Sequence, residues 1–200
     1  SGGLDSSLCL DIACSIFDKN VVALSIYYGQ RHAVEVTAAR KVASHYRVKH
    51  RELHLPASVF CESKGALTNN DVEVPEVTYR ELIEKNELSP LYVPFRNGVL
   101  LSLATAIALQ EDATLVYYGA HAEDNATWAY PDCSPEFGRS MHSAMYYGTG
   151  KQVSLRAPLQ GYTKKEIVEQ ALMRSMPLHL TYSCYKGGLK ACGKCPTCVS

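Results

Sequence analysis

A glycine turn that leads into a helix is the feature that most constrains the fold of this chain. Residues 1–7 read Ser-Gly-Gly-Leu-Asp-Ser-Ser, and apolar residues at helical spacing follow from Leu8 to Ile16. Adjacent glycines let the backbone turn where a Cβ would clash, and they bring bare N–H groups close to an anion. A helix dipole favours negative charge at the same end, so the pattern predicts a phosphate-binding turn on a helix over residues 5–17. The lysine of a Walker loop is absent, which leaves another kind of phosphate site or an ordinary capped turn.

Strand-like and helix-like segments alternate along the rest of the chain. We expect strands at residues 21–27, 50–55, 114–118 and 153–155, and helices at 33–46, 97–110, from 134 onward and at 163–173. Asn97 and Ser134 are the expected caps of two of these helices, and Thr163 with Glu166 forms a capping box. The alternation predicts a Rossmann-like α/β fold, a doubly wound parallel sheet with helices on both faces. Residues 56–94 form a long insertion in this pattern.

Polar residues gather in the segments that such a fold places beyond the carboxyl ends of its strands, where ligands bind. These segments are residues 1–7, 28–32, 119–133 and the stretch after Leu155. Carboxylates and aromatic rings of the third segment suit the donor edge and the face of a guanine-like base. Arg96 can pair a carboxylate or a phosphate bidentately. Lys164 stands in the first turn of a helix, where a phosphate would offset the unfavourable dipole; solvent exposure is the alternative for each of these side chains.

Four cysteines close to the C-terminus predict a metal site. Cys184, Cys192, Cys195 and Cys198, which we call the four-cysteine knot, have the spacing C-x7-C-x2-C-x2-C. Four sulfurs with no histidine nearby favour a closed, structural zinc site. An iron–sulfur cluster uses the same ligands and is the main alternative, ahead of disulfides or free thiols. Of the other cysteines, Cys9 and Cys14 are expected in the core, and Cys133 lies in a segment expected to face the ligand.

Length and charge limit the class of protein. The 200 residues suit an α/β domain over residues 1–175 and a metal-binding C-terminal loop over 176–200 packed on it. Lysine plus arginine equal aspartate plus glutamate at 20 each, which favours a small-molecule partner over a nucleic acid. No secretory signal or membrane-length apolar run is visible, so we expect a cytoplasmic protein with no membrane partner. A buried strand is expected before residue 1, so both ends of the chain read as trimmed.

The motifs and their order resemble a known family. Ser-Gly-Gly-x-Asp-Ser resembles the pyrophosphate loop of the ATP pyrophosphatases, which split ATP between its α and β phosphates. Nearly the whole chain resembles the QueC family of 7-cyano-7-deazaguanine synthases. Its further marks are Tyr-Gly-Gln-Arg-His at 28–32, Arg-Asn at 96–97, Tyr-Pro-Asp-Cys at 130–133, Pro-Leu at 158–159 followed by Lys164, and the four-cysteine knot. The resemblance implies an adenine nucleotide alpha hydrolase-like fold, a homodimer, and ATP, Mg²⁺ and Zn²⁺ as cofactors.

The resemblance also implies a reaction and its residues. A carboxylate repels nucleophiles, so the carboxylate of 7-carboxy-7-deazaguanine is adenylated, ammonia displaces AMP, and a second adenylation lets the amide become a nitrile. Catalysis would be mainly positioning and electrostatic stabilisation. The implied catalytic residues are Lys164, Arg96 and Asp5. The implied ATP-binding residues are Ser1, Gly2, Gly3, Leu4, Asp5, Ser6 and Ser7. The implied substrate-binding residues are Gln30, Arg31, His32, Asn97, Glu123, Asp124, Tyr130 and Asp132.

Two departures from the family pattern lie in the expected substrate region and question the substrate more than the ATP chemistry. Phe95 stands where a glycine is expected before Arg96, and the 119–133 segment differs from the shorter version of the best-known members. One alternative joins the adenylated deazaguanine to a protein amine in a bacterial defence system. A second is a tRNA thiolation enzyme, and a third is a zinc-held nucleotide-binding module without turnover.

Overall fold

The protein is a mixed α/β structure in which most of the expected elements form. A computed structural model describes residues 1–30, 34–60, 65–69, 71–78, 81, 84, 87–125, 129–188 and 190–199. The strands are β1 (Val22–Tyr27), β2 (Lys49–His54), β3 (Leu115–Tyr117) and β4 (Ser154–Arg156). The longer helices are α1 (Leu4–Phe17), α2 (Val34–Tyr46), α4 (Arg96–Gln110), α5 (Pro135–Gly148) and α6 (Lys164–Met173), and α7 (Pro196–Val199) is a single turn. Each expected strand and helix lies within a few residues of its predicted bounds.

The described strands pair in parallel, as the alternation predicts. β1 pairs with β2 with Val22 opposite Lys49, and β3 pairs with β4 with Leu115 opposite Ser154. Parallel neighbours need a crossover, and α2 and α5 lie in the two connections. The described residues form two separate two-stranded pairs, and no described strand is hydrogen-bonded to both. The parallel α/β class is therefore confirmed, with the strands divided between two short pairs.

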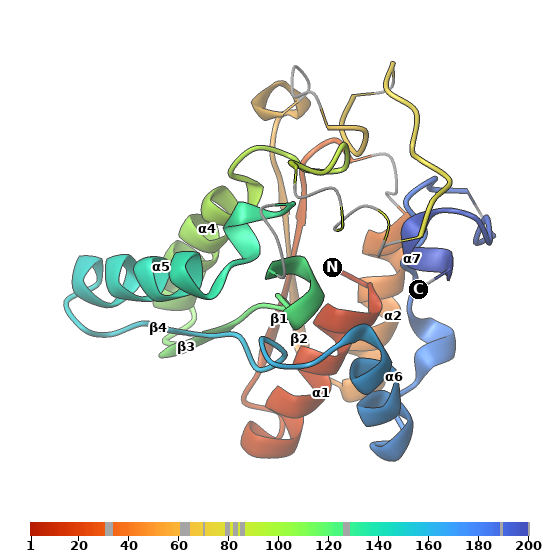
Figure 1. Ribbon diagram of the computed structural model, residues 1–200. Helices are drawn as coiled ribbons and strands as arrows, with labels where there is room; N and C mark the ends of the chain where they lie inside the picture. The colour runs from red at the N-terminus through yellow and green to blue at the C-terminus, as the bar shows by residue number, and fades with distance from the viewer. Residues whose placement is uncertain are drawn as a thin grey trace.

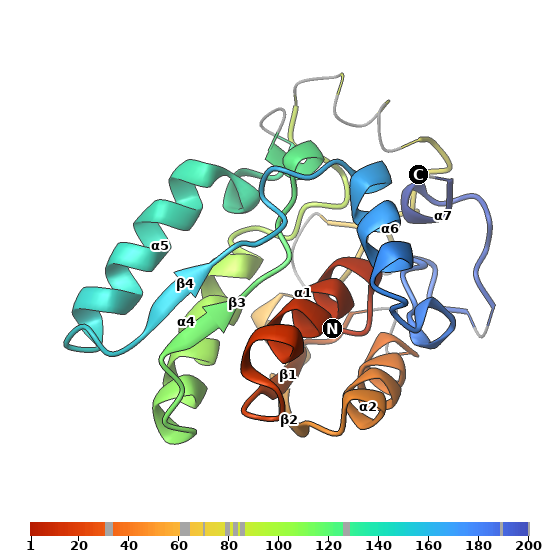
Figure 2. The same cartoon turned by 90° about the horizontal axis from the view of Figure 1, so that it is seen from below.

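Helix α1 occupies the middle of the molecule. Figures 1 and 2 show α4 and α5 beside β3 and β4 on one side of it, and α2 and α6 on the other. Leu8 is completely buried and packs with Leu159, Ile167 and Ala171 of the α6 region. Cys9 is buried beside Leu8 as expected, whereas Cys14 is only partly buried. The apolar face of α1 therefore fixes the helix whose first turn carries the phosphate-binding sequence.

Two of the three predicted helix caps are confirmed. The Ser134 hydroxyl accepts a hydrogen bond from the Phe137 N–H at 3.1 Å, and Thr163 and Glu166 form the reciprocal capping box. The prediction for Asn97 is wrong, because α4 begins at Arg96 and its capping residue is Phe95 in a left-handed conformation, φ 55°. The Asn97 N–H is directed instead to the Asp132 carboxylate, at 2.8 Å.

The left-handed conformation of Phe95 explains why a glycine would suit this position. A non-glycine residue there costs roughly 1–2 kcal/mol. Replacing Phe95 with glycine or with alanine removes the same edge-to-face contact with the Phe137 ring, at 6.0 Å between centroids. We therefore expect Phe95→Gly to be more stable than Phe95→Ala by about 1 kcal/mol in urea unfolding. An alanine variant as stable as the glycine variant would contradict this account of the strain.

The insertion covers the four-cysteine knot. Phe60, Val74 and Leu91 are buried in one apolar cluster with Cys184 and Cys195. Glu76 forms an ion pair with Lys186 and lies 4.0 Å from the Lys194 ammonium, so two residues of the C-terminal loop face one carboxylate of the insertion. The division of the chain at residues 175 and 176 stays a prediction. No helix in the described part of the chain is long and apolar enough to cross a membrane.

Candidate active site

The first residues of the chain form the predicted glycine turn at the start of α1. A Cβ on Gly2 would lie 2.3 Å from the Glu35 carbonyl oxygen and 2.4 Å from the Ala39 nitrogen, so only glycine fits against α2. Gly3 is the residue before the helix and is extended, and as a glycine it has no side chain with which to cap the helix. Within the described residues, the N–H groups of Asp5 and Ser6 meet no protein acceptor. An anion could take their place.

We call residues 1–7 the phosphate loop. Hydrogen bonds of the Ser6 hydroxyl stabilise this loop internally. The Ser6 hydroxyl contacts the carbonyl oxygens of Ser1 at 2.7 Å and of Gly3 at 3.1 Å, and it lies 3.0 Å from the Ser1 hydroxyl. The side chains of Asp5, Ser6 and Ser7 therefore do not cap α1. The reason is that Gly3 takes the capping position and Ser6 turns back to the loop carbonyls.

Lys164 and Asp5 meet at the edge of the phosphate loop. The Lys164 ammonium donates to both carboxylate oxygens of Asp5, at 2.7 and 2.9 Å, and both side chains are partly buried. The Lys164 N–H, at the start of α6, donates to the Glu123 carboxylate at 3.0 Å. A Cβ on Gly119 would lie 3.2 Å from the Asp5 Cβ, so the chain after β3 passes directly over the loop. Three segments predicted to converge at the strand ends do converge here.

Arg96 lies in a second polar cluster. Its Nη1 donates to the Tyr28 hydroxyl at 3.3 Å, and its guanidinium carbon lies 6.0 Å from the centre of the Tyr28 ring. Among the described residues its buried Nε has no hydrogen-bond partner. Burial opposes the charge, but neighbouring Tyr28 and Asp132 outweigh burial and raise the pKa of Arg96. The result is a permanent cation with donor capacity left for an anion.

Asn97 and Asp132 join the start of α4 to the 119–133 segment. The Asn97 side-chain amide donates to the Asp132 carbonyl oxygen and the Cys133 sulfur, both at 3.1 Å. The Asp132 carboxylate is buried, and burial raises its pKa. Burial likewise raises the pKa of the Cys133 thiol well above its ordinary value. Cys133 is thus a protonated thiol beneath this cluster.

The remaining predicted substrate residues lie in different surroundings. The Gln30 side chain is buried and accepts from the Tyr28 N–H at 2.8 Å, and the Tyr130 hydroxyl accepts from Ser89 at 2.9 Å. Asp124 lies 3.3 Å from the buried His121 ring. Arg31 and His32 lie outside the described residues. The substrate roles of this set stay predictions, and Gln30 and Tyr130 present buried rather than open side chains.

The four-cysteine knot has the geometry of a site for one metal ion. The four sulfur atoms lie within 4.8 Å of one another, and three of the pairs are 3.4, 4.0 and 4.0 Å apart. A tetrahedral ion with sulfur ligands at about 2.3 Å places them about 3.8 Å apart. Burial opposes ionisation of Cys192, but N–H donors from Lys194 and Cys195 outweigh it and lower its pKa to about 6. Four converging sulfurs can hold a metal.

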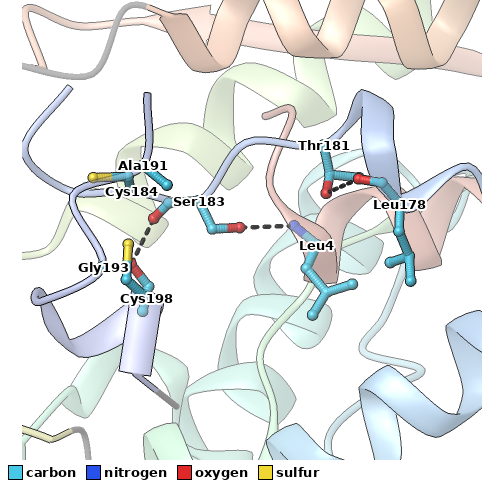
Figure 3. A pocket seen from close by; sticks show the side chains of 9 residues that line it. Leu4, Leu178, Thr181, Ser183, Cys184, Ala191, Gly193 and Cys198 are labelled. Carbon is cyan, nitrogen blue, oxygen red and sulfur yellow. Dashed lines mark hydrogen bonds between the residues drawn. The ribbon is translucent and has the colours of Figure 1, made fainter. Parts of the chain in front are cut away.

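A cavity separates the knot from the start of α1. It has a volume of about 330 Å³ and is lined by residues of both, as Figure 3 shows. Ser183 spans the two sides: its hydroxyl accepts from the Leu4 N–H at 3.2 Å, and its carbonyl accepts from the Thr197 hydroxyl at 2.6 Å. Ser183 and Tyr28 were not predicted as site residues. Tyr28 stands directly after β1, a position that could have singled it out, whereas nothing local marks Ser183.

The order of motifs is matched by a known family along the whole chain. The family described as "Queuosine biosynthesis protein QueC" matches residues 1–200. The chain belongs to the QueC family. Within it, the 7-cyano-7-deazaguanine synthase of Thermoplasma acidophilum is 39% identical over 203 residues, which cover 100% of this chain and 82% of the relative. The protein of the same name from Acetivibrio thermocellus is 38% identical over 204 residues, covering 100% of this chain and 87% of the relative.

A solved structure shares the fold of this QueC-family chain. The U34-tRNA thiolase NcsA from Methanococcus maripaludis, solved with its [4Fe-4S] cluster, superposes with a TM-score of 0.58 at 16% sequence identity. The match covers 92% of this chain, and this chain spans 58% of the thiolase. At that identity the likeness supports the α/β architecture alone.

Proposed function

We propose that this QueC-family protein is an ATP-dependent ligase that converts 7-carboxy-7-deazaguanine and ammonia into 7-cyano-7-deazaguanine. The observation that carries the proposal is the Lys164 ammonium held on Asp5 at the edge of the phosphate loop. Three features of this site suit the phosphates of ATP. The start of α1 offers free N–H groups, Gly2 stands where no larger residue fits, and the Lys164 ammonium is held in place. The relatives named 7-cyano-7-deazaguanine synthase support the nitrile as the product, and the resemblance to the QueC family implies the acid as its precursor.

The phosphate loop would bind ATP so that its α phosphorus faces the substrate. A carboxylate oxygen attacks that phosphorus and pyrophosphate leaves, with its added charge stabilised by the loop N–H groups and by Lys164. Ammonia then attacks the acyl carbon and AMP leaves with the former carboxylate oxygen. The amide oxygen then attacks the α phosphorus of a second ATP and pyrophosphate leaves. Loss of AMP and protons leaves the nitrile. Asp5 and the loop hydroxyls are oxygen donors of the kind that Mg²⁺ prefers, and Mg²⁺ would shield the phosphate charge.

Arg96 would hold the carboxylate of the acid. Its unpaired Nε and the rest of its guanidinium match a carboxylate bidentately. We place the deazaguanine ring between this cation and the polar residues of the 119–133 segment, Glu123, Asp124, Tyr130 and Asp132, with Gln30, Arg31, His32 and Asn97 around it. The carboxylates among them suit the donor edge of the base.

A conservative change at Arg96 tests that placement. Arg96→Lys keeps the charge but loses the planar fork. We expect kcat/KM for the acid to fall roughly 10- to 100-fold, the range of a hydrogen bond to a charged group, with the affinity for ATP unchanged. Arg139→Lys is the matched control, since Arg139 is largely exposed and pairs with Glu136 on the surface of α5. An Arg96→Lys enzyme with the wild-type kcat/KM would place the carboxylate elsewhere.

We propose zinc for the four-cysteine knot. Sulfurs this close together suit one ion, whereas a cluster attaches its thiolates to different iron atoms and spreads them wider. The set is complete with four ligands, so the ion would be structural. We further propose a cytoplasmic homodimer that acts on small molecules and takes no nucleic acid.

Incubation with ATP, Mg²⁺, ammonium and 7-carboxy-7-deazaguanine, read by mass spectrometry, tests the function. We expect AMP and the nitrile, each dependent on the acid. AMP with an adenylate or amide but no nitrile would favour transfer to another acceptor, such as a protein amine. Binding of ATP with no AMP would leave a nucleotide-binding module without turnover.

A further inference from the structure

We propose that Ser183 is a positioning residue that couples the four-cysteine knot to the phosphate loop, so that metal in the knot tightens the binding of ATP. The inference rests on the proposed function, since it takes residues 1–7 as the ATP site. In this proposal the knot affects the binding of ATP through Ser183, which is not one of the four cysteines.

Two hydrogen bonds join the segment before Cys184 to the phosphate loop. The Leu4 N–H, one of the first donors of α1, has the Ser183 hydroxyl as its acceptor at 3.2 Å. The Tyr182 N–H donates to the Gly2 carbonyl at 2.8 Å. The first N–H groups of a helix have no acceptor within the helix. The two bonds therefore fix both the path of the glycine turn and the direction of the donors that follow it.

The same segment is fixed on its other side by the knot. Thr197 lies between two cysteines of the knot, Cys195 and Cys198, and its hydroxyl donates to the Ser183 carbonyl at 2.6 Å. The residue after Ser183 is Cys184, itself a ligand and almost completely buried. Metal that draws the four sulfurs together thus holds Ser183 from two directions. Loss of the metal releases Cys184 and Thr197, and Ser183 with them.

A cavity lies between the four-cysteine knot and the phosphate loop, so the hydrogen bonds of Ser183 are the connection that matters. Figure 3 shows Leu4 on one side of the cavity and Cys198 and Gly193 on the other. The cavity has a volume of about 330 Å³. Because this space is open, packing across it holds Leu4 less firmly than a filled core would. Ser183 lines this cavity, and its hydrogen bonds to Leu4 and Thr197 connect the phosphate loop directly to the knot.

A mobile phosphate loop lowers the fraction of protein ready to bind ATP, and the apparent dissociation constant rises in proportion. One net hydrogen bond corresponds to roughly a 3- to 10-fold change. We therefore expect Ser183→Ala and Thr197→Val each to weaken ATP binding by about this factor while keeping their metal. The double variant should lose less than the product of the two factors, because both changes break one connection.

Calorimetric titration of the full chain with ATP and Mg²⁺, with metal content measured for each variant, tests the coupling. Thr181→Ala is the matched control, because Thr181 lines the same cavity but its hydroxyl donates locally to the Leu178 carbonyl at 2.8 Å. We expect the control to bind ATP like the wild type. Chelation of the metal should weaken ATP binding more in the wild type than in Ser183→Ala, where the connection is already broken. The rate of amide hydrogen exchange in residues 1–8 should rise both in the chelated wild type and in Ser183→Ala.

Wild-type ATP affinity in metal-loaded Ser183→Ala would overturn the inference. So would a weakening confined to variants that have also lost their metal, since the effect would then follow from damage to the knot. Failure of the wild type itself to bind ATP would overturn the proposed function and this inference with it, so the two failures are distinguishable.

Discussion

Lys164→Ala is expected to reduce AMP formation by about 10²- to 10³-fold, the range for removal of one electrostatic donor from a preorganised site. The ammonium is the cation bonded to Asp5 beside the phosphate loop, and both side chains are partly shielded from water. The variant removes the charge that balances the departing pyrophosphate and leaves the Asp5 carboxylate, itself a repulsive charge, without this partner. Rates of AMP release under saturating ATP and acid measure the effect.

The neighbouring lysine provides the control. Lys165 has the same charge one residue away, but its side chain is 84% exposed. Its ammonium lies 3.7 Å from a carboxylate oxygen of Glu169 on the surface of α6. Lys165→Ala should therefore retain wild-type AMP formation. Lys164→Ala should unfold at a denaturant concentration close to that of the control. Full activity in a folded Lys164→Ala protein would refute the catalytic role.

Cys195→Ser is expected to empty the four-cysteine knot and to lower the thermal midpoint. Cys195 is completely buried, and its sulfur lies 3.4 Å from the Cys198 sulfur and 4.0 Å from the Cys184 sulfur. A hydroxyl is a poor ligand for a thiolate-preferring ion, and structural zinc contributes directly to folding. A loss of about 3 kcal/mol would lower the midpoint by roughly 6–12 °C for a chain of this size. Metal analysis and a thermal scan measure both effects.

Cys14→Ser is the matched control for that change. Cys14 is a partly buried thiol on α1, outside the knot. It should keep the full metal content and a midpoint within a few degrees of the wild type. Equal metal content in the Cys195 and Cys14 variants would contradict the assignment of the knot as the metal site.

Local patterns predicted the elements of this fold well. The bounds of α1, the Ser134 cap and the Thr163–Glu166 capping box follow from periodicity and from side chains that bond within four residues. The predicted start of α4 was wrong because the Asn97 N–H donates to the Asp132 carboxylate, which is 35 residues away in the sequence. Strand pairing also depends on distant partners, and the two short pairs could not be read from the strands alone.

The sequence indicated which residues are candidates for the site, but it did not indicate which of them contact one another. Lys164 stood out because a cation is unfavourable in the first turn of a helix, but nothing in the sequence identified Asp5, 159 residues away, as its partner. Ser183 is a single serine without a motif, and its role depends on a bond to Leu4 across 179 residues. The four-cysteine knot could be predicted because the short spacing of its cysteines by itself brings the four sulfurs close together.

The most direct test of the central claim follows the oxygen atoms of the acid. The protein is incubated with ATP, Mg²⁺, ammonium and 7-carboxy-7-deazaguanine labelled with ¹⁸O in both carboxylate oxygens, and AMP and the nitrile are weighed by mass spectrometry. Because each adenylation removes one oxygen on AMP, we predict two AMP molecules for each nitrile, and one ¹⁸O atom in each AMP. Unlabelled AMP, or AMP without nitrile, would contradict the account.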